Sequence, residues 1–134
     1  MVDLTKNSSP ALGYNNIYSG TIYAQEAMSL ISNHNASEPL MLYLAWQINH
    51  TPLQVPSEYL ARFKHINDTR RQTYAAMTNF VDDGVLNVTR ALRDKGMWEN
   101  TIFVFSSDNG GPAGSANNWP LRGFKFSDLE AEPS

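Results

Sequence analysis

Two short apolar runs and one long amphipathic segment organise the middle of the chain. Residues 40–47 (LMLYLAWQ) and residues 101–107 (TIFVFSS) are each nearly continuous in apolar side chains. Runs of this length are typical of strands that are buried on both faces, as in a parallel sheet. Between them, from about Thr69 to Lys95, apolar residues recur at steps of three and four, which predicts an amphipathic helix. The pattern therefore predicts a strand, a long helix and a second strand.

Capping residues support the helix predictions. Asp68 or Thr69 can cap the start of the long helix, and Gly96 follows it where a left-handed C-terminal cap is expected. Residues 21–34 (TIYAQEAMSLISNH) also place apolar residues near helical spacing, with Thr21 as a candidate N-cap. These residues predict a second, shorter helix before the first strand.

The order of the elements predicts the fold class. A strand, a helix and a strand joined at these lengths favour a parallel pair with a right-handed crossover. The expected class is α/β, with a mostly parallel central sheet flanked by helices. Strands buried on both faces need more sheet and more helices than 134 residues of this pattern supply. The chain is therefore expected to be part of a larger α/β domain or to depend on a partner.

Composition narrows the class of protein. Hydrophobic residues make up 42% and charged residues 17% of the chain, and the net charge is -3. These values are typical of a globular protein, and they give no reason to expect nucleic acid or an anionic membrane as partner. No apolar run is long enough to span a bilayer. The absence of cysteine excludes a disulfide, a zinc–thiolate site and a thiol nucleophile from this chain.

Acceptor motifs for N-glycosylation suggest a compartment. Five Asn-x-Ser/Thr motifs in a chain this short favour a secretory history, and chance motifs in a cytosolic protein are the alternative. The first ten residues, MVDLTKNSSP, lack the apolar stretch of a signal peptide, so a preceding segment is expected to be missing. The motif before Pro52 is the poorest acceptor. The five motifs begin at Asn7, Asn35, Asn49, Asn67 and Asn87.

The second apolar run ends abruptly on polar residues and glycines. Asp108 offers a carboxylate and Asn109 a carbonyl oxygen, and adjacent hard oxygen ligands suit Ca²⁺ or Mg²⁺ rather than zinc. Gly110 and Gly111 let the backbone approach a bound group closely. A type I′ hairpin at Asn-Gly is the alternative. It requires a second strand directly afterwards, and GPAGSANNWPLRG has no strand pattern.

Polar residues also follow the first apolar run. Ligands of open α/β sheets bind beyond the carboxyl ends of the strands, so parallel strands would bring His50 to the same rim as Asp108. His50 could act as a general acid or as a donor to an anion; a loop histidine bonded to nearby backbone is the alternative. Arg122 and Lys125 could add positive charge to this rim or be ordinary surface charges.

Three sequence blocks resemble one enzyme family. LMLYLAWQINHTPLQVPSEYL, NVTRALRDKGMWENTIFVFSSDNGG and NNWPLRGFK, in this order, resemble the sulfatases, with greatest similarity to the arylsulfatase B type. The similarity runs from about Tyr18 to Lys125. It implies a sandwich fold of the sulfatase and alkaline-phosphatase-like kind. It also implies a partial catalytic domain over residues 21–125 and a divergent tail over residues 126–134. Residues 1–20 are rich in Asn, Ser, Gly and Tyr, which predicts an irregular lead-in.

The resemblance also implies roles for individual residues. The calcium-binding Asp-Asn pair of the family falls on Asp108 and Asn109. The histidine of the family's H-x-P-L-Q-V-P block contacts the substrate sulfate and falls on His50, which becomes a candidate proton donor to the departing alcohol. The lysine of the R-G-x-K block, another sulfate contact, falls on Lys125. Calcium and these cations would stabilise charge that builds on the sulfate oxygens.

Several family features have no match in this chain. Sulfatases use a formylglycine made from a cysteine in a C-x-P-S-R block, and this chain has no cysteine. An upstream aspartate pair of the family is also unmatched. The sequence therefore predicts a calcium-dependent sulfuric ester hydrolase that is inactive alone, with a sulfated small molecule or glycan as partner and a lysosomal or secretory location. Alternatives are a metal-dependent phosphoryl hydrolase, a non-catalytic binder of sulfated glycans, and a product without function.

Overall fold

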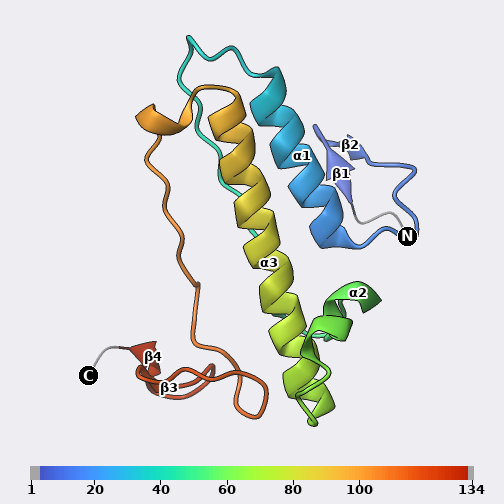
Figure 1. The fold of residues 1–134 in the computed structure, drawn as a ribbon, viewed down its shortest axis with the longest axis vertical. Coiled ribbons are helices and arrows are strands. Elements are labelled where there is room, and N and C mark those ends of the chain that lie inside the picture. The colour runs from blue at the N-terminus through green and yellow to red at the C-terminus, as the bar shows by residue number, and fades with distance from the viewer. Residues whose placement is uncertain (1–3, 133–134) are drawn as a thin grey trace.

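Two long helices form the centre of the structure. In the computed structural model, which describes residues 4–132, helix α1 (Ser19–Asn33) and helix α3 (Thr69–Asp94) lie side by side and run in the same direction (Figure 1). Residues 1–3 and 133–134, the outer ends of the predicted lead-in and tail, lie outside the described residues.

The short elements surround this pair. A hairpin of β1 (Thr5–Lys6) and β2 (Ser9–Pro10) precedes α1, and α2 with the 3₁₀ turns η1 and η2 flank α3. Near the C-terminus, β3 pairs antiparallel with β4. The bounds of these later elements are Ser57–Leu60 for α2, Ala61–Phe63 for η1, Trp98–Asn100 for η2, Arg122–Gly123 for β3 and Glu130–Glu132 for β4.

The core lies between the two long helices. Ala27 and Ile31 of α1 pack against Val88 and Leu92 of α3, and all four side chains are buried. At the end of the helices, the ammonium of Lys95 donates a hydrogen bond of 2.7 Å to the carbonyl oxygen of Ser32. Burial of aliphatic side chains is the main stabilising term in such a contact, so this interface holds the helices in register.

The predicted ends of the helices are mostly correct. Asp68 caps α3, because its side chain accepts a hydrogen bond of 2.7 Å from the backbone N–H of Arg71. Gly96 has a φ of +72° and ends the helix as expected for a left-handed C-terminal cap. The prediction for α1 is wrong in detail, since the helix begins at Ser19 and Thr21 lies inside it. Packing of Gly20 against Phe80 and Ile48 extends the helix beyond its sequence pattern.

The predicted strands do not pair with each other. Residues 40–47 and 101–107 run as extended segments in the same direction, opposite to α3 (Figure 1). Among the described residues, the sheets contain two short strands each, and neither sheet includes these segments. A parallel sheet is stable when helices cover both faces, and α1 and α3 cover one. The α/β class is therefore seen in the order and direction of the elements, while the described chain is mostly helical.

The first extended segment nevertheless behaves like a strand. Side chains along residues 40–48 alternate between half-buried and exposed, as the period of two in a strand requires. The inward face is formed by Leu40, Leu42 and Leu44, which pack on the helix core. On the outward face, Met41 is 89% exposed and Tyr43 is 84% exposed. One face of this segment is therefore covered and the other is open.

Candidate functional site

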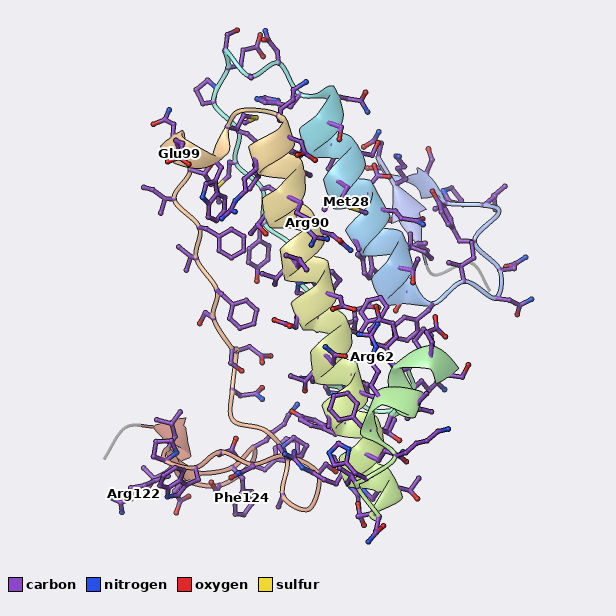
Figure 2. The ribbon with its side chains drawn as sticks, viewed as in Figure 1. Met28, Arg62, Arg90, Glu99, Arg122 and Phe124 are labelled. Atoms are coloured by element: carbon purple, nitrogen blue, oxygen red, sulfur yellow. The ribbon has the colours of Figure 1, made fainter. Side chains whose placement is uncertain are left out.

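Both extended segments end at the same end of α3. The tip of the first, Asn49, donates a hydrogen bond of 3.0 Å from its side-chain amide to the hydroxyl of Thr78 on α3. The second segment, residues 101–107, ends at the same end of α3 (Figure 1), and Asp108 follows it in sequence. Figure 2 shows Arg122 and Phe124 at this end of the molecule and Glu99 at the opposite end. This arrangement agrees with the single rim that a parallel topology predicts.

Tyr74 on α3 is affected by residues at both tips. Burial raises the pKa of its hydroxyl; the positive charge of Arg71 and the side chain of Asn49 lower that pKa, and the charge of Asp108 raises it. The pKa of this one side chain on α3 therefore depends on residues at both tips. Tyr74 counted only as an apolar position in the helix pattern, so the sequence did not identify this position.

Asn49 has one orphaned atom at this junction. Its side-chain oxygen is buried and has no hydrogen-bond partner within the described part of the chain. The residue also has a φ of +73°, which is a conformation that Asn adopts more readily than most residues. The turn that leads to His50 is therefore attached to α3 by the amide group of Asn49, while the oxygen of the same side chain stays unsatisfied among the described residues.

His50 is exposed and makes one local contact. Its Nδ1 lies 3.0 Å from the carbonyl oxygen of Thr51. Because Nδ1 donates this hydrogen bond, Nε2 is the ring nitrogen that remains for a hydrogen bond or a proton transfer. This local bond matches the alternative that the sequence left open, and it also leaves the imidazole accessible to a ligand. The role of His50 stays a prediction.

Asp108 and Asn109 present their oxygens at the tip of the second segment. Asp108 is exposed, and the amide group of Asn109 donates a hydrogen bond of 2.9 Å to the carbonyl oxygen of Gly110. That bond leaves the side-chain oxygen of Asn109 as the free acceptor. No hairpin follows, because the next described strand is β3 at Arg122–Gly123.

The donor chemistry fits calcium, but the site holds few ligands. A carboxylate and an amide oxygen are hard ligands, and Ca²⁺ takes six to eight of them. No group of three or more His, Cys, Asp or Glu side chains that could hold a metal occurs within residues 4–132. Asp108 and Asn109 can therefore supply part of a calcium site, and further oxygen ligands must come from elsewhere.

Lys125 is connected to the metal-binding candidates through the backbone. Its N–H donates a hydrogen bond of 3.2 Å to the carbonyl oxygen of Gly111, two residues after Asn109. Its ammonium lies 5.3 Å from the ring centroid of Phe126, within the range of a cation–π contact. The structure thus brings the backbone of Lys125 to the tip that carries Asp108 and Asn109.

The loop between these residues is attached to α3 and to itself. Arg71 donates a hydrogen bond of 2.9 Å from its guanidinium to the carbonyl oxygen of Ser115, which is buried. Asn118 hydrogen-bonds to the backbone of Gly111 and of Gly123. In the sequence this segment only lacks a strand pattern, and nothing in it points to Asn118, because the partners of Asn118 are set by the folded backbone.

Comparison with known proteins places the chain in a family. The sequence profile described as Sulfatase matches residues 3–132. Mouse arylsulfatase J is 42% identical over 125 residues, which are 92% of this chain and 21% of that protein. Human N-acetylgalactosamine-6-sulfatase is 30% identical over 89 residues, 66% of this chain and 16% of that protein. The chain therefore spans about a fifth or less of these curated relatives.

A solved structure agrees with the fold. The crystal structure of Ps i-CgsB in complex with k-i-k-neocarrahexaose superimposes with a TM-score of 0.83 at 36% identity. The alignment covers 93% of this chain and 28% of that one. The resemblance seen in the sequence blocks is confirmed at the level of the family. The finer similarity to the arylsulfatase B type and the division into lead-in, catalytic part and tail stay predictions.

Proposed function

This chain belongs to the sulfatase family, and we propose that it carries the sulfate-contacting half of a sulfuric ester hydrolase site. The observation that supports the proposal most is the link from Gly111 to Lys125. This link holds the lysine backbone beside the tip that carries Asp108 and Asn109. A cation and two hard oxygen donors at one rim suit an anionic ester bound with a metal ion.

Each residue has a chemical role in the proposal. Asp108 and Asn109 would hold calcium, which when bound supplies positive charge near the sulfate oxygens. The ammonium of Lys125 binds a sulfate oxygen, and in a site completed by a nucleophile it would stabilise the charge that grows on that oxygen in the transition state. In such a site, the imidazole group of His50 would donate a proton to the oxygen of the departing alcohol. His50 is exposed, so a substrate can reach it.

The proposal does not include turnover by this polypeptide alone. The chain contains no cysteine, so the formylglycine nucleophile that the family resemblance implies cannot form in it. Without a nucleophile, the remaining groups bind and polarise the ester but do not attack the sulfur. The expected activity of the isolated chain is therefore binding without hydrolysis.

The substrate class we propose is a sulfated sugar. Support comes from the names of relatives, which include an N-acetylgalactosamine-6-sulfatase and a structure with a bound hexaose.

We also propose a secretory or lysosomal location, because four of the five acceptor asparagines are exposed and Asn49 is the exception. Expression through the secretory pathway should then give glycan at some of the four exposed sites and none at Asn49. None of the helices within residues 4–132 has the length and hydropathy of a membrane-spanning segment.

A paired assay tests the reaction class. The purified chain is incubated with calcium and either p-nitrophenyl sulfate or p-nitrophenyl phosphate, and both binding and release of p-nitrophenol are measured. We expect the sulfate ester to bind more tightly and neither ester to be hydrolysed. Calcium-dependent release of p-nitrophenol from the sulfate ester would contradict the absence of turnover. Tighter binding of the phosphate ester would favour the phosphoryl hydrolase alternative.

A further inference from the structure

The side chain of Asn118 joins three points of the loop that carries Lys125. Its Oδ1 accepts a hydrogen bond of 2.8 Å from the N–H of Gly111. Its Nδ2 donates to the carbonyl oxygens of Gly111 at 3.0 Å and of Gly123 at 3.2 Å. We propose that Asn118 is a positioning residue that holds Lys125 at the tip bearing Asp108 and Asn109. This inference rests on the proposed function, in which Lys125 contacts sulfate.

The connection from Asn118 to Lys125 runs through one carbonyl group. The oxygen of Gly111 accepts hydrogen bonds from both the amide group of Asn118 and the backbone N–H of Lys125. Gly123, the other partner, lies two residues before Lys125. Asn118 therefore fixes both the group that Lys125 binds and the chain that leads to it.

The glycines at these contacts leave little freedom for the backbone. A Cβ at Gly111 would overlap Ala116 and lie 3.1 Å from the hydroxyl oxygen of Tyr74. Gly123 has a φ of +84°, and a Cβ there would collide with the carbonyl oxygen of Leu129. Both glycines are therefore packed closely against their surroundings, and the side chain of Asn118 links one to the other.

The chemistry of the bridge requires an amide at this position. One end of the Asn118 side chain accepts a hydrogen bond while the other donates two. An aspartate at this length has acceptors only, and an aliphatic side chain has neither. The neighbouring Asn117 makes a different contact, since its Oδ1 accepts a hydrogen bond of 3.1 Å from the N–H of Trp119. Asn117 is therefore a matched control of the same residue type in the same loop.

A double-mutant cycle tests the positioning role. The affinity of the chain for p-nitrophenyl sulfate in the presence of calcium is measured for four proteins: wild type, Asn118→Ala, Lys125→Met and the double variant. Asn118→Ala should weaken binding by about tenfold, corresponding to the loss of one well-placed charged contact. In the Lys125→Met background it should change affinity by less than about twofold, because the coupled effects are not additive. Asn117→Ala should stay within about twofold of wild type.

Hydrogen exchange separates failure of this inference from failure of the proposed function. The amide of Lys125 should exchange faster in Asn118→Ala than in wild type and Asn117→Ala, whether or not a sulfate ester binds. If wild type does not bind the ester but this difference is seen, the positioning stands and the proposed function falls. Unchanged exchange at Lys125, or equal losses of affinity in both backgrounds, would overturn the positioning role. Far-UV circular dichroism of each variant confirms that α1 and α3 remain folded.

Discussion

The two extended segments are similar in being runs of apolar residues, but their surroundings are very different. Residues 40–47 lay Leu40, Leu42 and Leu44 on the core between α1 and α3. In residues 101–107, Ile102 is 94% exposed and Val104 is 80% exposed. The second segment makes an aromatic contact through Phe103, whose ring centroid lies 6.1 Å from that of Trp98.

This difference shows what an apolar run needs in order to become a strand. The side-chain pattern favours an extended conformation in both segments, but a strand also needs neighbours that satisfy its backbone and cover its faces. The helices supply one covered face to residues 40–47 and much less to residues 101–107. The first segment is thus part of the packed core, and the second is attached mainly at its ends.

The largest predicted effect contrasts the core with the second segment. Ile31 is fully buried, so Ile31→Ala should lower the free energy of unfolding by about 2–5 kcal/mol. Ile102→Ala removes the same atoms from an exposed position and should change it by less than about 0.5 kcal/mol. Urea unfolding followed by circular dichroism measures both. Equal losses would mean that residues 101–107 are packed as tightly as the helix interface.

A second prediction tests the packing of the first segment on α3. The ring of Trp46 lies against Gly84, and a Cβ added there would come within 2.6 Å of it. Gly84→Ala should therefore destabilise the protein by about 1–3 kcal/mol through overpacking, more than the helix propensity of alanine restores. In a Trp46→Phe background the same change should cost less, because the smaller ring leaves room. A stabilising effect of Gly84→Ala would show that Trp46 moves freely.

A smaller effect is expected at the start of α3. Asp68→Ala removes the side chain that accepts the hydrogen bond from the N–H of Arg71 and should cost about 1 kcal/mol of stability. Asn67→Ala is the neighbouring control and should have little effect. Thermal unfolding of the three proteins compares them. If Asp68→Ala unfolds at the same temperature as wild type, the cap does not stabilise the helix that supports both tips.

The smallest effect concerns pH and Tyr74, whose pKa is affected by residues at the ends of both segments. Burial raises the pKa of its hydroxyl above the ordinary value of 10.0. Because the pKa of Tyr74 is higher in the folded state than in the unfolded state, its protonated hydroxyl contributes to stability. This contribution is fully present below about pH 10 and is lost as the pH rises through the folded-state pKa. Tyr74→Phe should therefore reduce the fall in stability between neutral and strongly alkaline pH. Burial of Tyr18 also raises its pKa, so part of the fall should remain. Identical slopes for wild type and variant would contradict this account of Tyr74.

The helices could be predicted because their signals lie close together in the sequence. The pairing of the two extended segments depends on contacts between distant residues, and the sequence pattern does not contain these. The periodicity of α3, its cap at Asp68 and its end at Gly96 depend on residues close in sequence, and all three were predicted. The pairing of residues 40–47 with residues 101–107 depends on neighbours beyond this pattern, and that prediction was wrong for the described residues. At the site, Asp108 and Asn109 stand out because they follow an apolar run.

Other site residues carry no sequence signal of their own. Asn118 forms hydrogen bonds with Gly111, and the pKa of Tyr74 is affected by Asn49 and Asp108, all of which lie far from them in sequence or come near only in the folded chain. Asn and Tyr at these positions are equally consistent with an ordinary loop and an ordinary helix. The sequence could therefore indicate which residues have suitable chemistry, and the structure was needed to show which residues hold them in place.

The most direct test of the central claim is a nuclear magnetic resonance titration. The ¹⁵N-labelled chain, with calcium present, is titrated with p-nitrophenyl sulfate, and the backbone amide shifts are mapped onto the structure. We expect the amides of His50, Asp108, Gly111 and Lys125 to shift together with one affinity, and Lys125→Met to weaken that affinity. Shifts confined to other regions, or the same affinity in Lys125→Met, would contradict the claim that these residues form the sulfate-contacting half of the site.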